Sequence, residues 1–354
     1  MTTRSKPAIG ILTASLNHGV GGNTQNFARI IRAASRQDVL CHVFNISAQG
    51  DVMAYAYDKH NRTFSSCTCS LPRVLYNRIP TRRLESLPAI KSMMDQWAGD
   101  GYLVTNPRFL RKDDFISKWF HDPVLSAYTP KTEVLDSFEA FASFLNEHYS
   151  VYIKPIDGKA GVGIYKITRV GHRVRVVKQR AKVIQQLGDM PLREAFVLVQ
   201  KGRPLPSFVI QEEAQTATYQ GRKFDLRLLI HRLRNDRFDV TGMGARVAGQ
   251  HGVTTHVPNG GFLASANDAL ESIYGKDHGA KVKAKVTQVA LKAADQIATI
   301  PGLWSELSMD IGISPAGEPV LFEANAKPMK FDERDIEMTA KVRLVTLLQS
   351  WASK

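Results

Sequence analysis

Two apolar segments near the C-terminal end of the chain predict a β-hairpin with oxygen-bearing side chains on one face. Residues 306–313 and 321–325 have strand-like sequences, and a Ser-Pro-Ala-Gly turn joins them. Glu323 and Asn325 are two residues apart, so both project from one face of a strand, and the hairpin brings Asp310 alongside them. Such hard oxygen ligands suit Mg²⁺, which usually takes one or two carboxylates and leaves its other positions to water and phosphate. The hairpin therefore predicts a nucleoside triphosphate site, against the alternative that these are solvated residues at strand ends.

The composition is that of an ordinary globular protein with a sizeable core. The chain has 354 residues, of which 44% are hydrophobic and 23% charged, and this length predicts two or three domains. The sequence does not approach 18 consecutive apolar residues, so we expect no transmembrane helix. The short apolar run after Arg4 and Lys6 fits a first buried strand better than a signal peptide, and we expect a cytoplasmic location.

The formal net charge of +14 favours an anionic partner. Nucleic acid, an acidic membrane surface and anionic small molecules would each explain it. The basic residues are spread along the chain and are not interleaved with aromatic residues as in a base-stacking platform. A nucleotide together with an acidic substrate therefore explains the charge at least as well as nucleic acid, which stays open on charge alone.

Three cysteines are present, and their spacing does not predict a metal site. Cys67 and Cys69 could form half of a thiolate site, but the sequence holds no second pair, and Cys41 stands alone. We expect these thiols to be reduced and to have an inert or structural role.

Hydrophobic periodicity and turn residues predict an α/β opening followed by a β-rich middle and two long helices. Residues 49–71 are expected to be irregular, and Gly19 to Gly22 to form a tight turn after the first strand, because they lack the third glycine and the acidic residue of a dinucleotide fingerprint. The expected strands are residues 9–14, 39–46, 74–76, 151–155, 164–169, 173–178, 207–213, 224–232 and 238–247. The expected helices are residues 24–34, 84–97, 192–199, 281–300 and 332–352, with a helical and polar region from 109 to 145.

The loop Gly158-Lys-Ala-Gly161-Val-Gly163 is the candidate for phosphate binding. Glycines let backbone amides approach an anion closely. The loop lies between two predicted strands and lacks the Lys-Ser/Thr pair and helix of a Walker loop. By itself this signal is weak, since many hairpins contain three glycines.

The order of these features along the chain resembles that of the ATP-grasp superfamily, and in particular its YheC/YheD endospore-coat-associated branch. A lysine and a glycine flap come first, then an acidic hinge, basic strands and metal carboxylates. The motifs that carry the resemblance are Gly22-Asn-Thr-Gln-Asn-Phe27, Tyr76-Asn-Arg-Ile-Pro80, Tyr152-Ile-Lys-Pro155, Phe224-Asp-Leu-Arg227 and Phe322-Glu-Ala-Asn325. The resemblance covers nearly the whole chain and is strongest from about residue 109 onward.

The resemblance implies an α/β (α+β) ATP-grasp fold with an N-terminal Rossmann-like pre-ATP-grasp domain. The implied divisions are residues 1–108 for the N-terminal domain, 109–205 for ATP-grasp subdomain A with the glycine flap, and 206–354 for subdomain B with the metal ligands. ATP and Mg²⁺, with two ions expected, are the implied cofactors.

The resemblance also assigns a role to each candidate residue. The metal ligands would be Asp310, Glu323 and Asn325, and the catalytic residues Arg246 and Arg227. The nucleotide would be bound by Lys118, Lys154, Gly158, Gly161, Gly163, Gln211, Glu212, Glu213, Asp225 and Asn259. Arg78 and Arg82, just beyond a predicted strand end, are candidate substrate contacts, against the alternative of ordinary surface arginines.

The implied activity is that of a carboxylate–amine ligase acting through an acylphosphate, and the basic charge suggests an acidic amino acid or peptide as substrate. A phosphotransferase on the same fold and a non-catalytic, nucleotide-binding spore-coat protein are the alternatives. A spore-associated location and a homodimeric state stay open.

Overall fold

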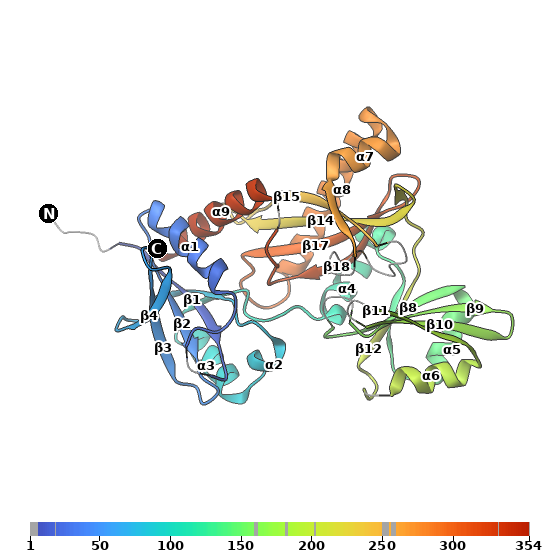
Figure 1. The fold of residues 1–354 in the computed structure, drawn as a ribbon, viewed down its shortest axis with the longest axis horizontal. Helices are drawn as coiled ribbons and strands as arrows, with labels where there is room; N and C mark the ends of the chain where they lie inside the picture. The colour runs from blue at the N-terminus through green and yellow to red at the C-terminus, as the bar shows by residue number, and fades with distance from the viewer. Residues whose placement is uncertain are drawn as a thin grey trace.

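The computed structural model describes residues 6–17, 19–158, 162–180, 183–201, 203–249, 255, 260–331 and 333–353. Its strands form three six-stranded sheets. The N-terminal sheet lies at one end of the molecule, the sheet with the glycine loop at the other, and the third sheet between them (Figure 1). Among the described helices, none is both long enough and apolar enough to cross a membrane.

The first sheet has a parallel centre and an antiparallel edge, in the order β4-β3-β2-β1-β5-β6. Its strands are β1 (Ala8–Ala14), β2 (Leu40–Ile46), β3 (Val52–Asp58), β4 (Thr63–Cys67), β5 (Val74–Asn77) and β6 (Leu103–Thr105), and its helices are α1 (Thr24–Arg36), α2 (Arg82–Glu85) and α3 (Pro88–Gly99). The expectation of an irregular segment at 49–71 is wrong, because β3 and β4 form a hairpin that pairs with β2. The single helix expected at 84–97 is also interrupted, since Pro88 starts a new helix.

The second sheet is antiparallel, in the order β11-β10-β9-β8-β12-β7. Its strands are β7 (Thr132–Leu135), β8 (Ser150–Pro155), β9 (Ile164–Val170), β10 (Arg173–Arg180), β11 (Val183–Met190) and β12 (Phe208–Glu212), with helices α5 (Phe138–Glu147) and α6 (Leu192–Gln200). The hairpin expected on either side of Gly171 is confirmed. The helical expectation for 109–145 is wrong in part, because β7 pairs with β12 there.

The third sheet holds the C-terminal hairpin, in the order β16-β15-β14-β17-β18, with β13 beside β14. Its strands are β13 (Thr218–Tyr219), β14 (Arg222–Arg232), β15 (Phe238–Val247), β16 (Phe262–Ser265), β17 (Glu306–Ile313) and β18 (Pro319–Asn325), with helices α7 (Ala266–Tyr274) and α8 (Lys276–Ala298). The expected hairpin is confirmed: β17 and β18 are antiparallel, and in the turn the Gly317 amide donates to the Ser314 carbonyl at 2.9 Å.

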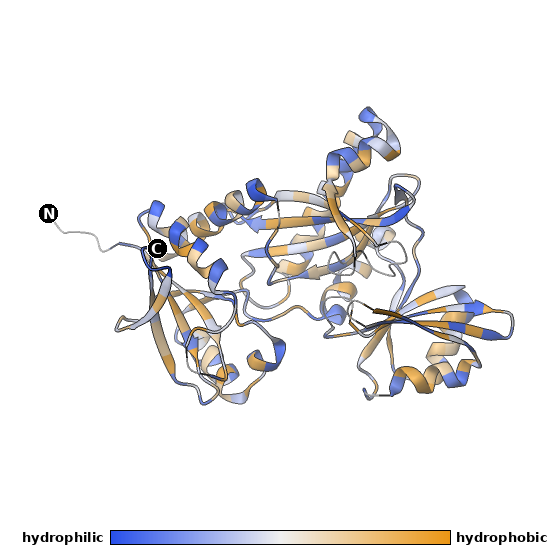
Figure 2. Cartoon of the chain, in the orientation of Figure 1, coloured by the Kyte–Doolittle hydropathy of each residue, from blue (hydrophilic) through white to orange (hydrophobic). Residues whose placement is uncertain are grey.

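Each sheet buries a hydrophobic cluster against its helices. The strands carry much of the hydrophobic sequence, whereas α5 and α6 show hydrophobic and hydrophilic residues in turn (Figure 2). We propose that the domain boundaries lie at residues 108 and 205. Two helices pack against elements on the other side of these boundaries. Helix α4 (Lys112–Phe120) packs on α8, and α9 (Arg334–Ala352) packs on α1, β1 and β5 as well as on β14 and β15. The chain therefore returns at its end to the first sheet, beside α1 (Figure 1).

Candidate functional site

The third sheet brings the predicted metal ligands into register on one face. Arg227 lies opposite Asp310 on β17, and Asp310 lies opposite Glu323 on β18. Asn325 follows two residues after Glu323, so it shares that face. The residues between them, such as Met309 and Ala324, are buried in the core on the other face. Strand alternation therefore aligns a row of charged side chains on the side away from α8.

Arg246 binds two carboxylates in this row. Its guanidinium donates two hydrogen bonds of 2.8 Å to Asp225, and Nη2 lies 2.9 Å from Oδ2 of Asp310. Burial opposes a charge on Arg246, but the carboxylates of Asp225 and Asp310 outweigh it and raise its pKa. Arg227 is more loosely placed, with Nη1 3.9 Å from Oδ1 of Asp310. Four residues that the sequence analysis singled out therefore lie close together: Asp225, Arg227, Arg246 and Asp310.

Lys112 also reaches this site, and the sequence prediction missed it. Its ammonium lies 3.2 Å from Oε1 of Glu323 and 3.1 Å from the carbonyl oxygen of Gly158. Lys118, which was predicted instead, is exposed on the same helix. A sequence signal existed: Lys112 precedes the buried Phe115 and Ile116 by three and four residues, so it lies on the buried face of α4.

Lys154 lies on the face of the second sheet that carries Gln211, since β8 and β12 pair there. Its ammonium donates a hydrogen bond to the side chain of Gln211, and it lies 5.9 Å from the centre of the Phe322 ring in the third sheet. Burial lowers the pKa of Lys154 to about 8, with Glu323 raising it and Lys112 lowering it further. The two sheets therefore present Lys154 and Glu323 within electrostatic reach of each other.

Glu213, just after β12, is held by several donors. Lys166 and Lys223 lie 2.7 and 2.8 Å from its Oε1, and the Tyr152 hydroxyl donates to the same oxygen at 3.1 Å. Burial raises the pKa of Glu213, but the hydrogen bonds from the two lysines dominate and bring it to about 2. Glu213 is therefore an anion over the whole physiological pH range.

The predicted hinge borders a cavity of about 540 Å³. Glu212 and Glu213 line it from the second sheet, and Pro315 from the β17–β18 turn. Glu212 is fixed there by the backbone amide of Lys131 at 2.8 Å and by Nδ1 of His148 at 3.2 Å. The remaining lining residues are Glu147, His148, Tyr149, Ser150, Ala214, Gln215, Thr216, Thr218 and Lys223.

The glycine loop is described in part. The Gly158 amide donates to the Pro155 carbonyl at 3.1 Å, and the Gly163 amide to the Gln179 carbonyl at 3.0 Å. Gly163 has a φ of +77°, a backbone conformation that favours glycine. Gly161 and Asn259 lie outside the described residues.

Arg78 and Arg82 occupy different environments. Arg78 lies 3.2 Å from Oε1 of the buried Glu306 and donates to the Pro328 carbonyl at 3.0 Å. Arg82 donates to the Leu110 carbonyl and stacks 5.1 Å from the centre of the Phe109 ring. Arg78 is thus part of an ion pair between the first and third sheets.

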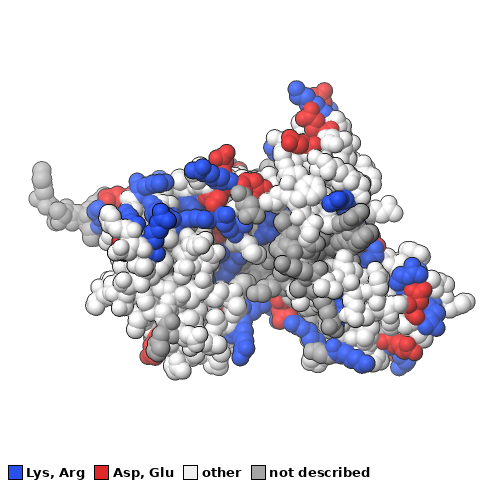
Figure 3. All heavy atoms as spheres, viewed as in Figure 1, with Lys and Arg blue, Asp and Glu red and all other residues white. Residues whose placement is uncertain are grey.

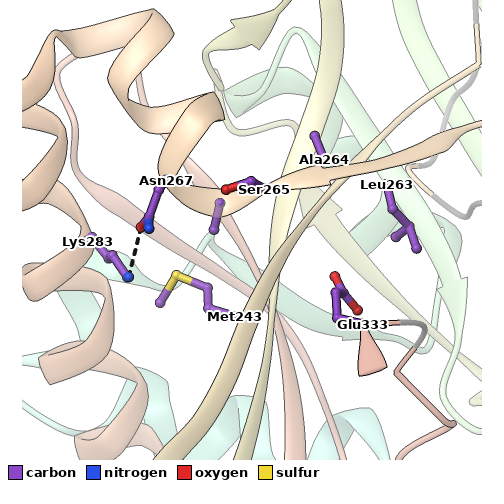
Figure 4. Close-up of a pocket in the computed structure, with 8 residues that line it drawn as sticks. Met243, Leu263, Ala264, Ser265, Asn267, Lys283 and Glu333 are labelled. Atoms are coloured by element: carbon purple, nitrogen blue, oxygen red, sulfur yellow. Dashed lines mark hydrogen bonds between the residues drawn. The ribbon is translucent and has the colours of Figure 1, made fainter. Parts of the chain in front are cut away.

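A second cavity, of about 410 Å³, lies at the β16 edge of the third sheet. Glu333 reaches it over Gly244, where an added Cβ atom would lie 2.3 Å from a carboxylate oxygen, so a larger residue there would displace the Glu333 side chain. Figure 4 shows Met243, Asn267 and Lys283 on one side of the strands and Leu263 and Glu333 on the other. Its described lining differs from the predicted site residues, so we do not assign the nucleotide to it.

The oxygen donors on β17 and β18 fit a magnesium ion. Two carboxylates and one amide face the same side of adjacent strands, and this is the ligand chemistry that Mg²⁺ prefers. Both carboxylates are balanced by protein cations, Asp310 by Arg246 and Glu323 by Lys112.

Three solved structures that share this fold are named as two ligases and a synthetase. VanG D-Ala:D-Ser ligase from Enterococcus faecalis matches with a TM-score of 0.61 and 11% identity, over 97% of this chain and 100% of that one. The D-alanine-D-alanine ligase from Coxiella burnetii matches with a TM-score of 0.57 and 10% identity, over 98% and 96%. The D-cycloserine synthetase DcsG matches with a TM-score of 0.55 and 14% identity, over 98% and 99%. At these identities the likeness concerns the fold, and it confirms the expected ATP-grasp architecture.

Sequence comparison identifies the family. The endospore coat-associated protein YheD of Bacillus subtilis (strain 168) is 25% identical over 343 residues, which cover 92% of this chain and 74% of YheD. A model of the YheC/D-like ATP-grasp family matches residues 101–353, which include the second and third sheets. The chain therefore belongs to the YheC/D-like ATP-grasp family.

Proposed function

We propose that this protein is an ATP- and Mg²⁺-dependent carboxylate–amine ligase that acts through an acylphosphate. The observation that carries the proposal is the charged row on the third sheet. Arg227, Asp310 and Glu323 lie opposite one another on three adjacent strands, and Arg246 binds Asp310 from the next strand. Cations and oxygen ligands on one face suit a reaction that transfers a phosphoryl group.

The nucleotide would lie between the second and third sheets. Lys112 and Lys154 would bind its phosphates, in place of the exposed Lys118, because Lys112 pairs with Glu323 and Lys154 lies within electrostatic reach of the same carboxylate. The loop with Gly158, Gly161 and Gly163 would close over the β- and γ-phosphates. Gln211, Glu212 and Glu213 would contact the adenine and ribose, next to the cavity that the two glutamates line.

Asp310, Glu323 and Asn325 would hold the metal ions. Bound Mg²⁺ would neutralise the phosphate oxygens. On this proposal, Arg246 and Lys112 balance the negative charges of Asp310 and Glu323 when no metal is bound. As the sequence resemblance implies, Asn259 would support this site.

The reaction would proceed in two steps. An oxygen of the substrate carboxylate attacks the γ-phosphorus, the bond from that phosphorus to the bridging oxygen breaks, and ADP leaves. The amine then attacks the acyl carbon, and the C–O bond to phosphate breaks while the amine loses a proton to solvent. Arg246 and Arg227 would stabilise the negative charge that develops on the transferred group, and removing one such donor typically costs on the order of 10²–10³ in rate.

We propose an acidic amino acid or peptide as the substrate. The net charge of +14 supports this, and Figure 3 shows lysine and arginine side chains near the hollow between the domains as well as over α1 and α9. Arg82 would contact the substrate carboxylate, and Arg78 would do so only if it exchanged its bond to Glu306. The named neighbours join or make small amino-acid products, which agrees with a small substrate here.

The first test is thermal stability with ATP and Mg²⁺, separately and together, for the wild type and for Glu323→Gln. A ligand that binds only the folded state at 100 times its Kd adds about 2.7 kcal/mol. We expect a metal-dependent increase in Tm that Glu323→Gln abolishes. Glu271→Gln, an exposed change on α7, is the matched control and should keep the full increase.

Product analysis follows with a panel of acidic carboxylates and amines. The proposed ligase forms ADP, phosphate and an amide. ADP with a phosphoester would instead identify a phosphotransferase. ATP binding without turnover over the panel would favour a non-catalytic role, as in the coat association that the name of YheD describes.

A further inference from the structure

The first sheet contains a cluster of metal-ligating side chains that is separate from the proposed ligase site. The ligand atoms of His42, Cys67 and Cys69 all lie within 4.8 Å of one another. The sequence alone shows two cysteines with one residue between them and gives no partner for them. The fold supplies the third ligand from a strand 25 positions earlier in the chain (67 minus 42).

The strand register explains how these residues meet. Ala54 on β3 lies opposite both Phe44 on β2 and Cys67 on β4. Directly paired residues share a face of the sheet, and His42 shares it too because it is two residues before Phe44. The small side chain of Ala54 on the intervening strand leaves room for the longer ones to approach each other above it. Cys69, just beyond β4, packs with Cys67 against the same hydrophobic cluster.

The chemical state of the three groups suits a soft metal ion. All three cysteines are free thiols in the structure, and Cys67 and Cys69 are partly accessible. Thiolate and imidazole donors suit zinc and other transition metals, whereas magnesium and calcium prefer oxygen donors.

We propose that His42, Cys67 and Cys69 bind one Zn²⁺ ion, with water in the fourth position. Two thiolates and one imidazole are a ligand set that zinc takes in tetrahedral sites, whereas Mg²⁺ prefers oxygen. Thiolates on a tetrahedral zinc are about 3.8 Å apart, as follows from Zn–S bonds of about 2.3 Å. The two sulfurs lie within 4.8 Å of each other, so they need to approach by roughly 1 Å at most. Binding displaces the two thiol protons to solvent and forms two Zn–S bonds and one Zn–N bond.

The consequence is a cross-link at the edge of the first sheet. The ion would connect β2 to β4 and to the segment that follows it, across β3. Edge strands are the least supported part of a sheet, and a ligand that binds only the folded chain stabilises it. Zinc should therefore raise the Tm of the 354-residue chain without nucleotide.

The test uses the whole 354-residue chain, reduced and freed of metal. Co²⁺ titration should produce a thiolate-to-cobalt charge-transfer band that saturates at one ion per chain, and Zn²⁺ should displace the cobalt and raise Tm. Cys67→Ser, Cys69→Ser and His42→Ala should each weaken Zn²⁺ binding by at least about 100-fold, beyond the loss typical of an outer partner. Cys41→Ala is the matched control, since Cys41 is buried and points to the opposite face of β2.

The outcomes decide the proposal. Absence of the charge-transfer band in the wild type overturns it, and this measurement does not depend on whether a variant folds. Full binding in Cys67→Ser, or equal loss in Cys41→Ala, overturns it as well. Because Glu323→Gln removes a carboxylate from the other site, it should leave the cobalt band unchanged, and this separates the zinc site from the proposed ligase site.

Discussion

At the scale of single residues, the ammonium group of Lys112 connects three segments of the proposed site. Lys112, at the start of α4, contacts both Glu323 on β18 and the carbonyl of Gly158 in the glycine loop. Its side chain is only 9% exposed, so its charge acts where solvent screening is weak. Lys112 is therefore placed to respond to any anion or metal that binds at Glu323.

Lys112→Met should weaken ATP binding and ADP formation, each by about 100-fold, because a buried charge next to the proposed phosphate position would be lost. Lys118→Met is the matched control on the same helix. It removes an exposed lysine and should stay within about twofold of the wild type. Isothermal titration with ATP and Mg²⁺ and a coupled ADP assay measure both.

If the two variants lose affinity equally, the role we give to Lys112 is wrong. If only Lys118→Met is impaired, the result favours the prediction from sequence that Lys118 binds the nucleotide. Circular dichroism of both variants should match that of the wild type, because neither substitution removes hydrophobic side chains from the core.

The residue scale is also where sequence reasoning worked best and failed most clearly. Asp310, Glu323 and Asn325 could be predicted to share a face because strand alternation and a tight turn determine it. Lys112 was missed because its contact with Glu323 spans 211 positions. Only the buried periodicity of α4 could have favoured it over Lys118.

At the scale of elements, α9 connects the beginning of the chain to its end. Leu344, Val345 and Leu348 are buried in the same hydrophobic cluster as Ile9 on β1 and Phe27 on α1. The opposite side of the helix faces solvent, for example at Val342, which is 53% exposed. The C-terminal helix is therefore part of the N-terminal core.

Leu348→Ala should reduce the free energy of unfolding by about 2–5 kcal/mol, because it leaves a cavity in that core. Val342→Ala, on the exposed side of the same helix, should change it by less than about 0.5 kcal/mol. Urea unfolding followed by circular dichroism compares the two. Equal values for both variants would mean that α9 does not stabilise the first sheet.

Some elements could be predicted from local sequence, and others depend on partners that are far away. The β9–β10 hairpin and the long helix α8 follow from periodicity and turn residues. The β3–β4 hairpin was missed because β4, Thr-Phe-Ser-Ser-Cys, is mostly polar and is held by pairing with β3. The same pairing brings Cys67 towards His42, so that cluster could not be predicted without the sheet order.

At the scale of the whole molecule, a buried carboxylate joins the first and third sheets. Glu306 on β17 is 3% exposed. Its Oε1 accepts a hydrogen bond from the Tyr76 hydroxyl on β5 and forms an ion pair with Arg78. Nε2 of His231 on β14 lies 3.4 Å from its Oε2. Burial raises the pKa of Glu306, but the nearby His231 and the charge of Arg78 dominate and bring it to about 2.

Replacing Glu306 with glutamine should destabilise the protein by about 3–5 kcal/mol at neutral pH, because Arg78 would remain buried without its counterion. The pKa of Glu306 is lowered from 4.5 to about 2 in the folded state, so its contribution is fully present above pH 4.5 and is lost as the pH falls through 2. The difference between the wild type and Glu306→Gln should therefore be largest at neutral pH and shrink under acid.

Urea unfolding of the two proteins at a series of pH values from about 7 down to about 3 measures this difference. Glu318→Gln is the control, since Glu318 is 48% exposed and pairs with Lys285 at the surface, and should differ from the wild type by about 1 kcal/mol or less throughout. A difference for Glu306→Gln that stays constant as the pH falls would show that its charge is not what stabilises the junction. If the free energy of unfolding of Glu306→Gln differs from that of the wild type as little as Glu318→Gln does, the ion pair of Arg78 does not stabilise the junction. That result would favour the prediction that Arg78 contacts the substrate.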